Sequence, residues 1–393
     1  MSRPRMLRDP AAQATFAAYP AVPNPTRRPL LRRLLLWGLT IIGFLLSAAG
    51  LAYAFELELG VRATLVGAAT AALPLAAVIP VFLWLDRYEA EPRRLKLFAF
   101  GWGALVAPAV AIVLNTGSTQ LLRASGVDDA QTLGAVFFAP VTEETTKGLA
   151  VLLVFWFARR EVDGVIDGLV YAGLAAAGFA LSENILYFGR AVAEGSEGAL
   201  PAVFVLRGIM GPFAHPIFTA CTGIGIGIAA VSRSWLVRVV AIAVGWVGAV
   251  LLHALWNLSA QSGVQGYLTV YALVQVPLFG AYVGLIGWSR RREGRLIGAH
   301  LAPYADAGWL TRPEVAMLAS ARGRHVARAW ARRTGGRRGR SSMQAFQDSA
   351  SELALLRARV VQGSAGPHSA FTERTLLDAM AAHRRSFGGT PVA

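Results

Sequence analysis

One apolar stretch of this sequence decides the class of the protein: residues 164–189 read GVIDGLVYAGLAAAGFALSENILYFG. A helix of about 20 mostly apolar residues spans the hydrocarbon core of a bilayer, which is about 30 Å thick. Runs of similar length and composition lie at residues 34–55, 62–85, 96–116, 131–158, 202–231, 236–260 and 267–289. The whole chain is 55% hydrophobic and only 16% charged, which excludes an ordinary soluble enzyme. The sequence predicts an all-α, polytopic integral membrane helix bundle with about eight transmembrane helices.

The basic residues between these runs predict the orientation of the helices. Arginine and lysine gather in every second connection, at Arg87, Arg93, Arg94, Lys96, Arg159, Arg160, Arg233 and Arg238. The connections in between hold only Arg62, Arg123 and Arg190. Because basic residues stay on the cytoplasmic side of a membrane, an eight-helix chain with both termini in the cytoplasm accounts for every connection.

The two ends of the chain differ from its apolar middle, residues 34–289. Residues 1–33 are rich in proline, alanine and arginine without apolar periodicity, and are expected to form a disordered basic N-terminal tail. Residues 290–393 carry 18 arginines against seven acidic residues and predict a small, helical, basic cytosolic tail. Helices are expected at 313–333 and 343–361, with a gap at 334–342. This charge could attract anionic lipid, whereas no motif for specific nucleic-acid binding accompanies it.

Ionisable residues inside the apolar runs are expensive, since one charge at the bilayer centre costs roughly 2.5–3.5 kcal/mol. They are concentrated in four consecutive runs, as Glu143, Glu144 and Lys147, then Glu183, then Arg207 and His215, then His253. Arg207 is interpreted as a structural counter-charge or a snorkelling residue. The remaining residues predict one shared site.

A spacing of four residues links each of these groups to a second polar side chain. The patterns are Glu143-Glu144-x-x-Lys147, Glu183-Asn184-x-x-Tyr187, His215-x-x-x-Thr219 and His253-x-x-Trp256-Asn257. Residues four apart share one face of a helix, so the sequence predicts four polar faces that meet. Counted from the predicted outer helix ends, this site lies in the outer half of the membrane or near its midplane. We therefore expect a cavity that opens to the outside.

This set of residues fits peptide hydrolysis, which needs a base or a metal to activate water and donors to stabilise the oxyanion. Glu143 or Glu144 is the candidate general base, and His215, His253 and Asn257 are candidate oxyanion donors. The other members of the patterns are expected to support the site: Lys147, Asn184, Tyr187, Thr219 and Trp256. The sequence has no His-Glu-x-x-His motif, deep pair of aspartates or serine in an activating context. These absences argue against the corresponding types of intramembrane protease.

The four patterns, in this order on successive helices, resemble the PrsW family of intramembrane proteases, which is related more distantly to the CAAX prenyl endopeptidases. The resemblance covers roughly residues 80–290 and includes the stretch 86–92, DRYEAEP. It implies that Glu143, Glu144, Glu183, His215 and His253 matter for activity. It also implies cleavage of a single-pass membrane protein near the outer face of a bacterial plasma membrane, typically of an anti-sigma factor.

The sequence leaves the cofactor and the function class open. His215, His253 and Glu144 could form a three-ligand zinc site with an open position for water, or the same residues could act without a metal. The lack of a local pair of ligands favours the metal-free form. The intramembrane acids and histidines could also form a proton or cation pathway in a transporter. A third interpretation is a non-catalytic scaffold that recruits partners through its basic tail.

Overall fold

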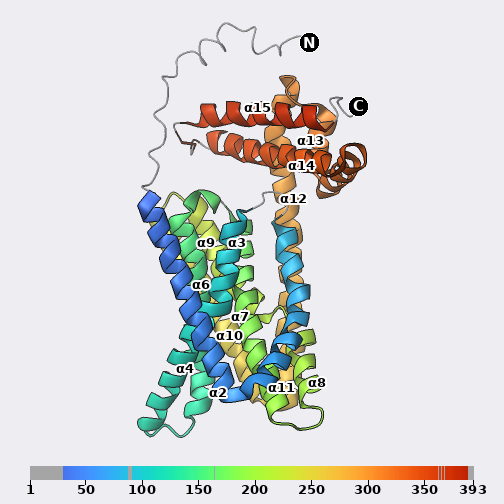
Figure 1. Ribbon diagram of the computed structural model, residues 1–393. Coiled ribbons are helices and arrows are strands. Elements are labelled where there is room, and N and C mark those ends of the chain that lie inside the picture. Colours follow the sequence, from blue (N-terminus) through green and yellow to red (C-terminus); the bar gives the residue numbers. More distant parts are fainter. Residues whose placement is uncertain are drawn as a thin grey trace. The chain divides into compact units, whose positions relative to one another are not determined.

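The computed structural model describes residues 30–86, 91–162, 164–361 and 368–387, together with Gly363, Ala365 and Gly366. Every regular element in these residues is a helix, and six helices are long and apolar enough to cross a membrane. The prediction of an all-α, polytopic membrane helix bundle is confirmed (Figure 1). Residues 1–29 of the predicted N-terminal tail and residues 87–90 of the DRYEAEP stretch lie outside the described residues.

Two compact units make up the chain, and the described part of the larger one comprises residues 30–86 and 91–286. Its elements are α2 (Leu30–Leu85), α3 (Arg93–Gly101), η2 (Trp102–Val106), α4 (Ala107–Ala124), α5 (Ala130–Leu133), η3 (Gly134–Phe138), α6 (Ala139–Phe157), η4 (Arg159–Glu161), α7 (Val165–Ala193), α8 (Ala199–Val203), η5 (Phe204–Met210), α9 (Ala214–Val231), α10 (Trp235–Gln261), α11 (Gly263–Val270), η6 (Tyr271–Gln275) and the first part of α12 (Val276–Asp306). The elements η2, η3, η5 and η6 are π-helical turns, and η4 is a short 3-10 helix. The domain boundaries predicted at residues 33 and 289 stay a prediction.

The structure has six long apolar helices where the sequence predicted eight apolar runs, and two local features of the described residues explain the difference. Helix α2 contains two runs, because Gly60 adopts a left-handed φ of 74° between them. The two halves of α2 run in opposite directions from this glycine (Figure 1). Helix α6 contains a further run, but Glu143, Glu144 and Lys147 make it too polar to count among the six. The charges of α6 therefore mark a helix that needs polar partners from its neighbours.

Helix α7 lies at the centre of the larger unit, and all its residues from 167 to 179 are buried. This stretch is rich in glycine and alanine, which allow neighbouring backbones to approach closely. A Cβ atom on Gly103 would lie 1.9 Å from the carbonyl oxygen of Ala175, and one on Gly178 would lie 2.2 Å from that of Phe100. These glycines fix α7, and with it Glu183, against the helix formed by α3, η2 and α4.

The smaller unit contains the described residues between Gly287 and Phe387. It consists of the end of α12, then α13 (Arg312–Leu318), α14 (Ala321–Val361) and α15 (Ser369–Ser386). Its core is apolar and includes Ile297, Leu301, Leu318, Phe346 and Leu353. The non-helical segment predicted at 334–342 is reduced to one residue. Helix α14 continues on both sides of Gly336, which has a φ of 61°.

Candidate active site

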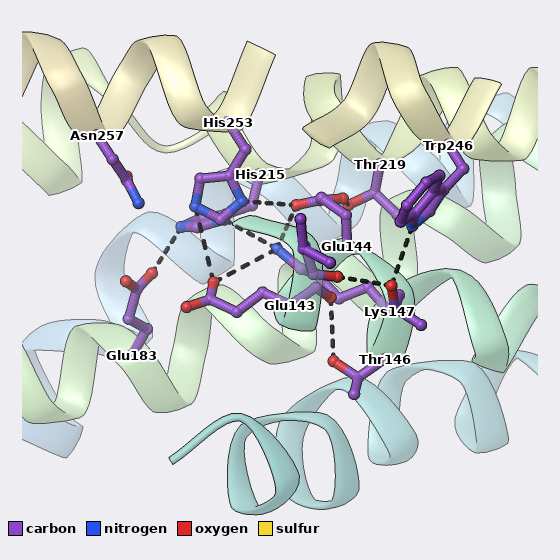
Figure 2. Close-up of polar contacts among 12 residues, drawn as sticks. Glu143, Glu144, Thr146, Lys147, Glu183, His215, Thr219, Trp246, His253 and Asn257 are labelled. Carbon is purple, nitrogen blue, oxygen red and sulfur yellow. Dashed lines mark hydrogen bonds and ion pairs between the residues drawn. The ribbon is translucent and has the colours of Figure 1, made fainter. Parts of the chain in front are cut away.

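Four helices bring the predicted polar residues into one cluster, as Figure 2 shows. Helix α6 contributes Glu143, Glu144 and Lys147, α7 contributes Glu183, α9 contributes His215 and Thr219, and α10 contributes His253 and Asn257. We call Glu143, Glu144, Lys147, His215 and His253 the site cluster, and all five are buried. A buried polar group left unpaired costs about 1–3 kcal/mol, so the contacts of each residue indicate its role.

Glu144 is the most completely bonded member of the site cluster. Its Oε1 atom accepts a hydrogen bond from Lys147 Nζ at 2.6 Å and lies 2.9 Å from His253 Nδ1. Its Oε2 atom accepts from the Thr219 hydroxyl at 2.8 Å. Neither Glu144 nor Lys147 has any exposed surface. Glu144 therefore joins α6, α9 and α10, and both oxygens of its buried carboxylate already have partners.

His215 owes its position to an interruption of the predicted sixth transmembrane helix. The π-helical turn η5 ends at Met210, residues 211–213 are not helical, and α9 begins at Ala214. Such breaks are tolerated at membrane depth where protein surrounds the freed backbone groups. The Nε2 atom of His215 lies 2.6 Å from Glu183 Oε2, and its Nδ1 atom lies 3.3 Å from Lys147 Nζ. Both ring nitrogens are engaged.

The Glu-Asn-x-x-Tyr pattern of α7 holds one arginine from η5. Arg207 donates from Nη2 to Glu183 Oε2 at 2.6 Å and from Nε to Asn184 Oδ1 at 2.9 Å. Its guanidinium carbon lies 3.9 Å from the centre of the Tyr187 ring, in a cation–π contact. Arg207 is the counter-charge of Glu183, as expected from the sequence, and all three members of the pattern contact it.

Glu143 differs from its neighbour Glu144 because one of its oxygens is free. Its Oε1 atom accepts a hydrogen bond from Asn115 Nδ2 at 3.3 Å. Its Oε2 atom is buried and has no hydrogen-bond partner among the described residues. The nearest charged groups to Oε2 are farther away, with His253 Nε2 at 3.7 Å and Lys147 Nζ at 3.9 Å. Glu143 therefore has an acceptor available for a proton, a water or a metal ion.

A cavity of about 400 Å³ reaches the site, and Asn115, Glu143, Ser182, Glu183 and Asn257 belong to its wall. The wall continues through polar residues near helix ends: Glu58, Arg123, Gln131 and Arg190. Glu58 and Arg190 form an ion pair across this part of the cavity wall. The cavity thus gives water a path toward Glu143, as the sequence predicted, and its opening to the outside of the membrane stays a prediction.

Two further predicted residues support the site from α10. Asn257 donates from Nδ2 to the backbone oxygen of Ala135 at 2.8 Å. Ala135 lies in the π-helical turn η3, where the altered backbone frees carbonyl groups from their usual helical partners. The ring of Trp256 packs against those of Phe218 and Tyr267, at centroid distances of 6.4 and 5.2 Å. These contacts hold η3, the first turns of α9 and helix α11 against α10.

Three members of the site cluster could hold a metal ion. Glu143, His215 and His253 each offer one ligand atom, and these three atoms lie within 4.8 Å of one another. Two histidines and a carboxylate are a common set of zinc ligands in catalytic sites. The orphaned Oε2 atom of Glu143 fits a ligand role, and carboxylates bonded to both imidazoles are usual behind metal sites. The predicted set has Glu144 in place of Glu143, but both oxygens of Glu144 are already bonded.

Sequence reasoning missed Asn115, which lies on α4 in a run without ionisable residues at its centre. It contacts Glu143 and lines the same cavity. The signal that could have identified it is an amide inside an otherwise apolar stretch, APAVAIVLN, at residues 107–115. An amide has no net charge, so a search for charged residues in apolar runs overlooks it.

Known proteins resemble the part of the chain that carries this site. Residues 91–282 match the model of a family described as PrsW family intramembrane metalloprotease. Residues 91–282 are therefore similar to the PrsW family. The Protease PrsW of Geobacillus kaustophilus (strain HTA426) is 30% identical over 154 residues, which are 39% of this chain and 62% of that relative. No solved structure matches the chain.

The matched segment, residues 91–282, contains the whole site cluster, Asn115 and Arg207, whereas α13, α14 and α15 lie outside it. The chain spans about 62% of the length of the curated relative it matches. The predicted resemblance to the PrsW family is thus confirmed, and the long apolar helices together with the PrsW match support a multi-pass membrane protein.

Proposed function

We propose that this protein is an intramembrane endopeptidase in which Glu143 accepts a proton from the attacking water. The observation that carries the proposal is the free Oε2 atom of Glu143 at the wall of a polar cavity. A general base must lie within hydrogen-bond reach of its water, and Glu143 belongs to the cavity wall whereas Glu144 does not. The name and family of the curated relative, a protease PrsW, support the same activity.

The other polar residues would hold Glu143 and stabilise the reacting carbonyl. The contacts of Glu144 with Lys147 and His253 keep α6 and α10 in register beside the cavity. Asn257 uses one amide N–H for Ala135 and has a second one for the oxyanion, since an amide carries two donors. After the carbonyl is attacked, Glu143 can return the proton to the leaving nitrogen.

A metal ion fits the same donors. Glu143, His215 and His253 would hold it, and zinc bound there would polarise a water molecule or the substrate carbonyl. In that form Glu144 and Glu183 orient the two imidazoles through the contacts they already make. Metal content decides between this form and a metal-free glutamate base.

The proposed substrate is a single-pass membrane protein, such as an anti-sigma factor of a bacterial plasma membrane, cut near the outer face. The cavity supports this assignment, because its polar wall reaches Arg123 and Arg190, which lie in connections that the sequence places outside. The same rule places both termini in the cytoplasm. The arginine-rich residues of the smaller unit would then meet anionic lipid.

Cleavage of a fluorogenic transmembrane peptide by the purified full-length protein in detergent tests this function. We expect Glu143→Gln to lower the rate at least about 100-fold, because the base is lost. Glu197→Gln makes the same change at an exposed position between α7 and α8 and is expected to retain the wild-type rate. Full cleavage by Glu143→Gln would contradict the proposal, and ion flux into proteoliposomes without any cleavage would favour a transporter.

Metal analysis of the same samples separates the two forms of the site. Zinc near one per chain, with cleavage that a chelator abolishes, would place Glu143, His215 and His253 among the ligands. Chelator-resistant cleavage without bound metal would leave Glu143 as a free base. In the first case His253→Ala should remove the zinc itself, which is measured without reference to activity.

A further inference from the structure

Among the described residues outside the predicted patterns, Asn115 is the one whose side chain hydrogen-bonds to the carboxylate of Glu143. Its Nδ2 atom donates to Glu143 Oε1 at 3.3 Å, which is the orientation a carboxylate requires because it can only accept. The other polar atom of this amide is Oδ1. That oxygen is buried and has no hydrogen-bond partner among the described residues.

Two unpaired acceptors, Asn115 Oδ1 and Glu143 Oε2, therefore belong to residues of the cavity wall, and both atoms are buried. The Nδ2–Oε1 bond keeps the amide and the carboxylate next to each other. A water molecule has two O–H donors and is stable in a buried polar site when it finds two to four partners. The two unpaired acceptors match the two donors of one water.

We propose that Asn115 is a second catalytic residue, which binds the attacking water through Oδ1 while Glu143 binds it through Oε2. This inference rests on the proposed endopeptidase function in its metal-free form, in which Glu143 Oε2 is not a metal ligand. The water would be held in one orientation, with its lone pairs turned away from both acceptors and toward the peptide carbonyl. Because misplacement of a reacting group by about 1 Å can cost about 100-fold in rate, orienting the water is a sizeable contribution.

The step balances with these two residues alone. The water oxygen forms a bond to the carbonyl carbon, and the proton that it shares with Glu143 moves to Oε2. The second O–H of the water stays bonded to Asn115 Oδ1, so Asn115 takes up no proton. When the carbon–nitrogen bond breaks, Glu143 gives its proton to the leaving nitrogen. Glu143 is then ionised again, with Asn115 Nδ2 still donating to Oε1.

Steady-state cleavage of the transmembrane peptide by the full-length protein tests the role of Asn115. Asn115→Leu has nearly the same shape without either polar atom, and is expected to lower kcat about 100-fold with KM nearly unchanged. Asn115→Ala should retain more activity than Asn115→Leu, because the space it leaves can hold a second water that accepts in place of Oδ1. A packing role predicts the reverse order, since alanine would leave the larger void.

Ser118→Ala is the matched control on the same helix. Ser118 bonds to the backbone oxygen of Asn115 at 3.0 Å and is not part of the cavity wall, so wild-type kinetics are expected. Monodisperse elution of each variant shows that it is folded, and Asn115→Ala keeps the test available if Asn115→Leu does not fold.

Each outcome bears on the proposal. Unchanged kcat in Asn115→Leu, a change confined to KM, or lower activity in Asn115→Ala than in Asn115→Leu would overturn the role of Asn115 while leaving the protease intact. Absence of cleavage by the wild type would overturn the endopeptidase function and, with it, this inference.

Discussion

Two buried polar clusters of the larger unit differ in how completely their groups are paired. The first consists of Asp86, Glu91, Lys96 and Tyr171, which join the end of α2 to α3 and α7. Asp86 Oδ1 accepts from the backbone N–H of Glu91 at 2.9 Å, and Asp86 Oδ2 forms an ion pair with Lys96. The Tyr171 hydroxyl donates to Glu91 Oε2 at 2.6 Å. We call this the α2–α3 cluster.

The pairing of the α2–α3 cluster is consistent with a structural role. Burial raises the pKa of the Asp86 carboxyl, and the bonds from Lys96 and from the Glu91 backbone oppose this rise. Both oxygens of Asp86 have partners, and the residue is 5% exposed. A buried network in which every group is satisfied rigidifies the structure around it.

The site cluster is paired in the same way except at one residue. Glu144 uses both oxygens, whereas the adjacent Glu143 leaves Oε2 free at the cavity. Glu143 Oε2 is one of several buried atoms without a hydrogen-bond partner among the described residues, and it differs from most of them because its residue belongs to both the site cluster and the cavity wall. We propose that this unpaired atom, rather than the density of charge, marks the reactive position.

The largest effect on stability is expected where a charge loses its partner in the paired part of the site cluster. Lys147→Met removes the ammonium group 2.6 Å from Glu144 Oε1 and leaves a carboxylate without any exposed surface. Breaking a buried ion pair from one side typically costs about 3–5 kcal/mol. The unfolding temperature in detergent should fall markedly, or the yield of monodisperse protein should collapse.

The double variant Glu144→Gln with Lys147→Met is the control for this prediction. It removes both charges and should recover part of the loss, because no unpaired charge remains. A single variant Lys147→Met that unfolds at the wild-type temperature would show that the pair does not hold the cluster together.

A smaller effect is expected in the α2–α3 cluster. Tyr171→Phe removes the donor to Glu91 Oε2, and hydrogen bonds to charged groups are worth about 1.5–3 kcal/mol. The unfolding temperature should fall, while peptide cleavage per folded molecule stays at the wild-type rate. Tyr53→Phe, at a position of α2 that is 65% exposed, should change neither. A lowered cleavage rate in folded Tyr171→Phe would show that the α2–α3 cluster takes part in the reaction, and the two clusters would then not differ in role.

The sequence could predict the helices and the grouping of the charged residues because both follow from the cost of polar groups in lipid. Long apolar runs can only be helices, and charges within them must face one another. Which glutamate is free could not be predicted. Glu143 and Glu144 differ by about 100° around α6, and only the packing of α4, α9 and α10 decides which of them meets the cavity.

The role of Asn115 and the helix boundaries of the tail could not be predicted from the sequence, for related reasons. An uncharged amide costs less in lipid than a charge and occurs often as a contact between helices, so Asn115 gave a weak signal. In the tail, glycine and arginine at 334–342 suggested a loop, but helix α14 continues through them apart from Gly336. Helix ends in polar segments depend on tertiary contacts that the sequence pattern does not contain.

The smallest change in stability is expected at Glu143, and the same substitution at the adjacent Glu144 gives the comparison. Glu143→Gln loses no hydrogen bond at Oε2 and removes a buried charge, so the free energy of unfolding should change by less than about 1 kcal/mol or rise slightly. Glu144→Gln leaves Lys147 buried without its carboxylate and should lower the unfolding temperature clearly. Both are measured on purified protein in one detergent. An equal loss at the two positions would remove the distinction between paired and free glutamates. If Glu143→Gln is inactive but as stable as the wild type, and Glu144→Gln is destabilised, then Glu143 acts in the reaction and the adjacent Glu144 holds the helices together.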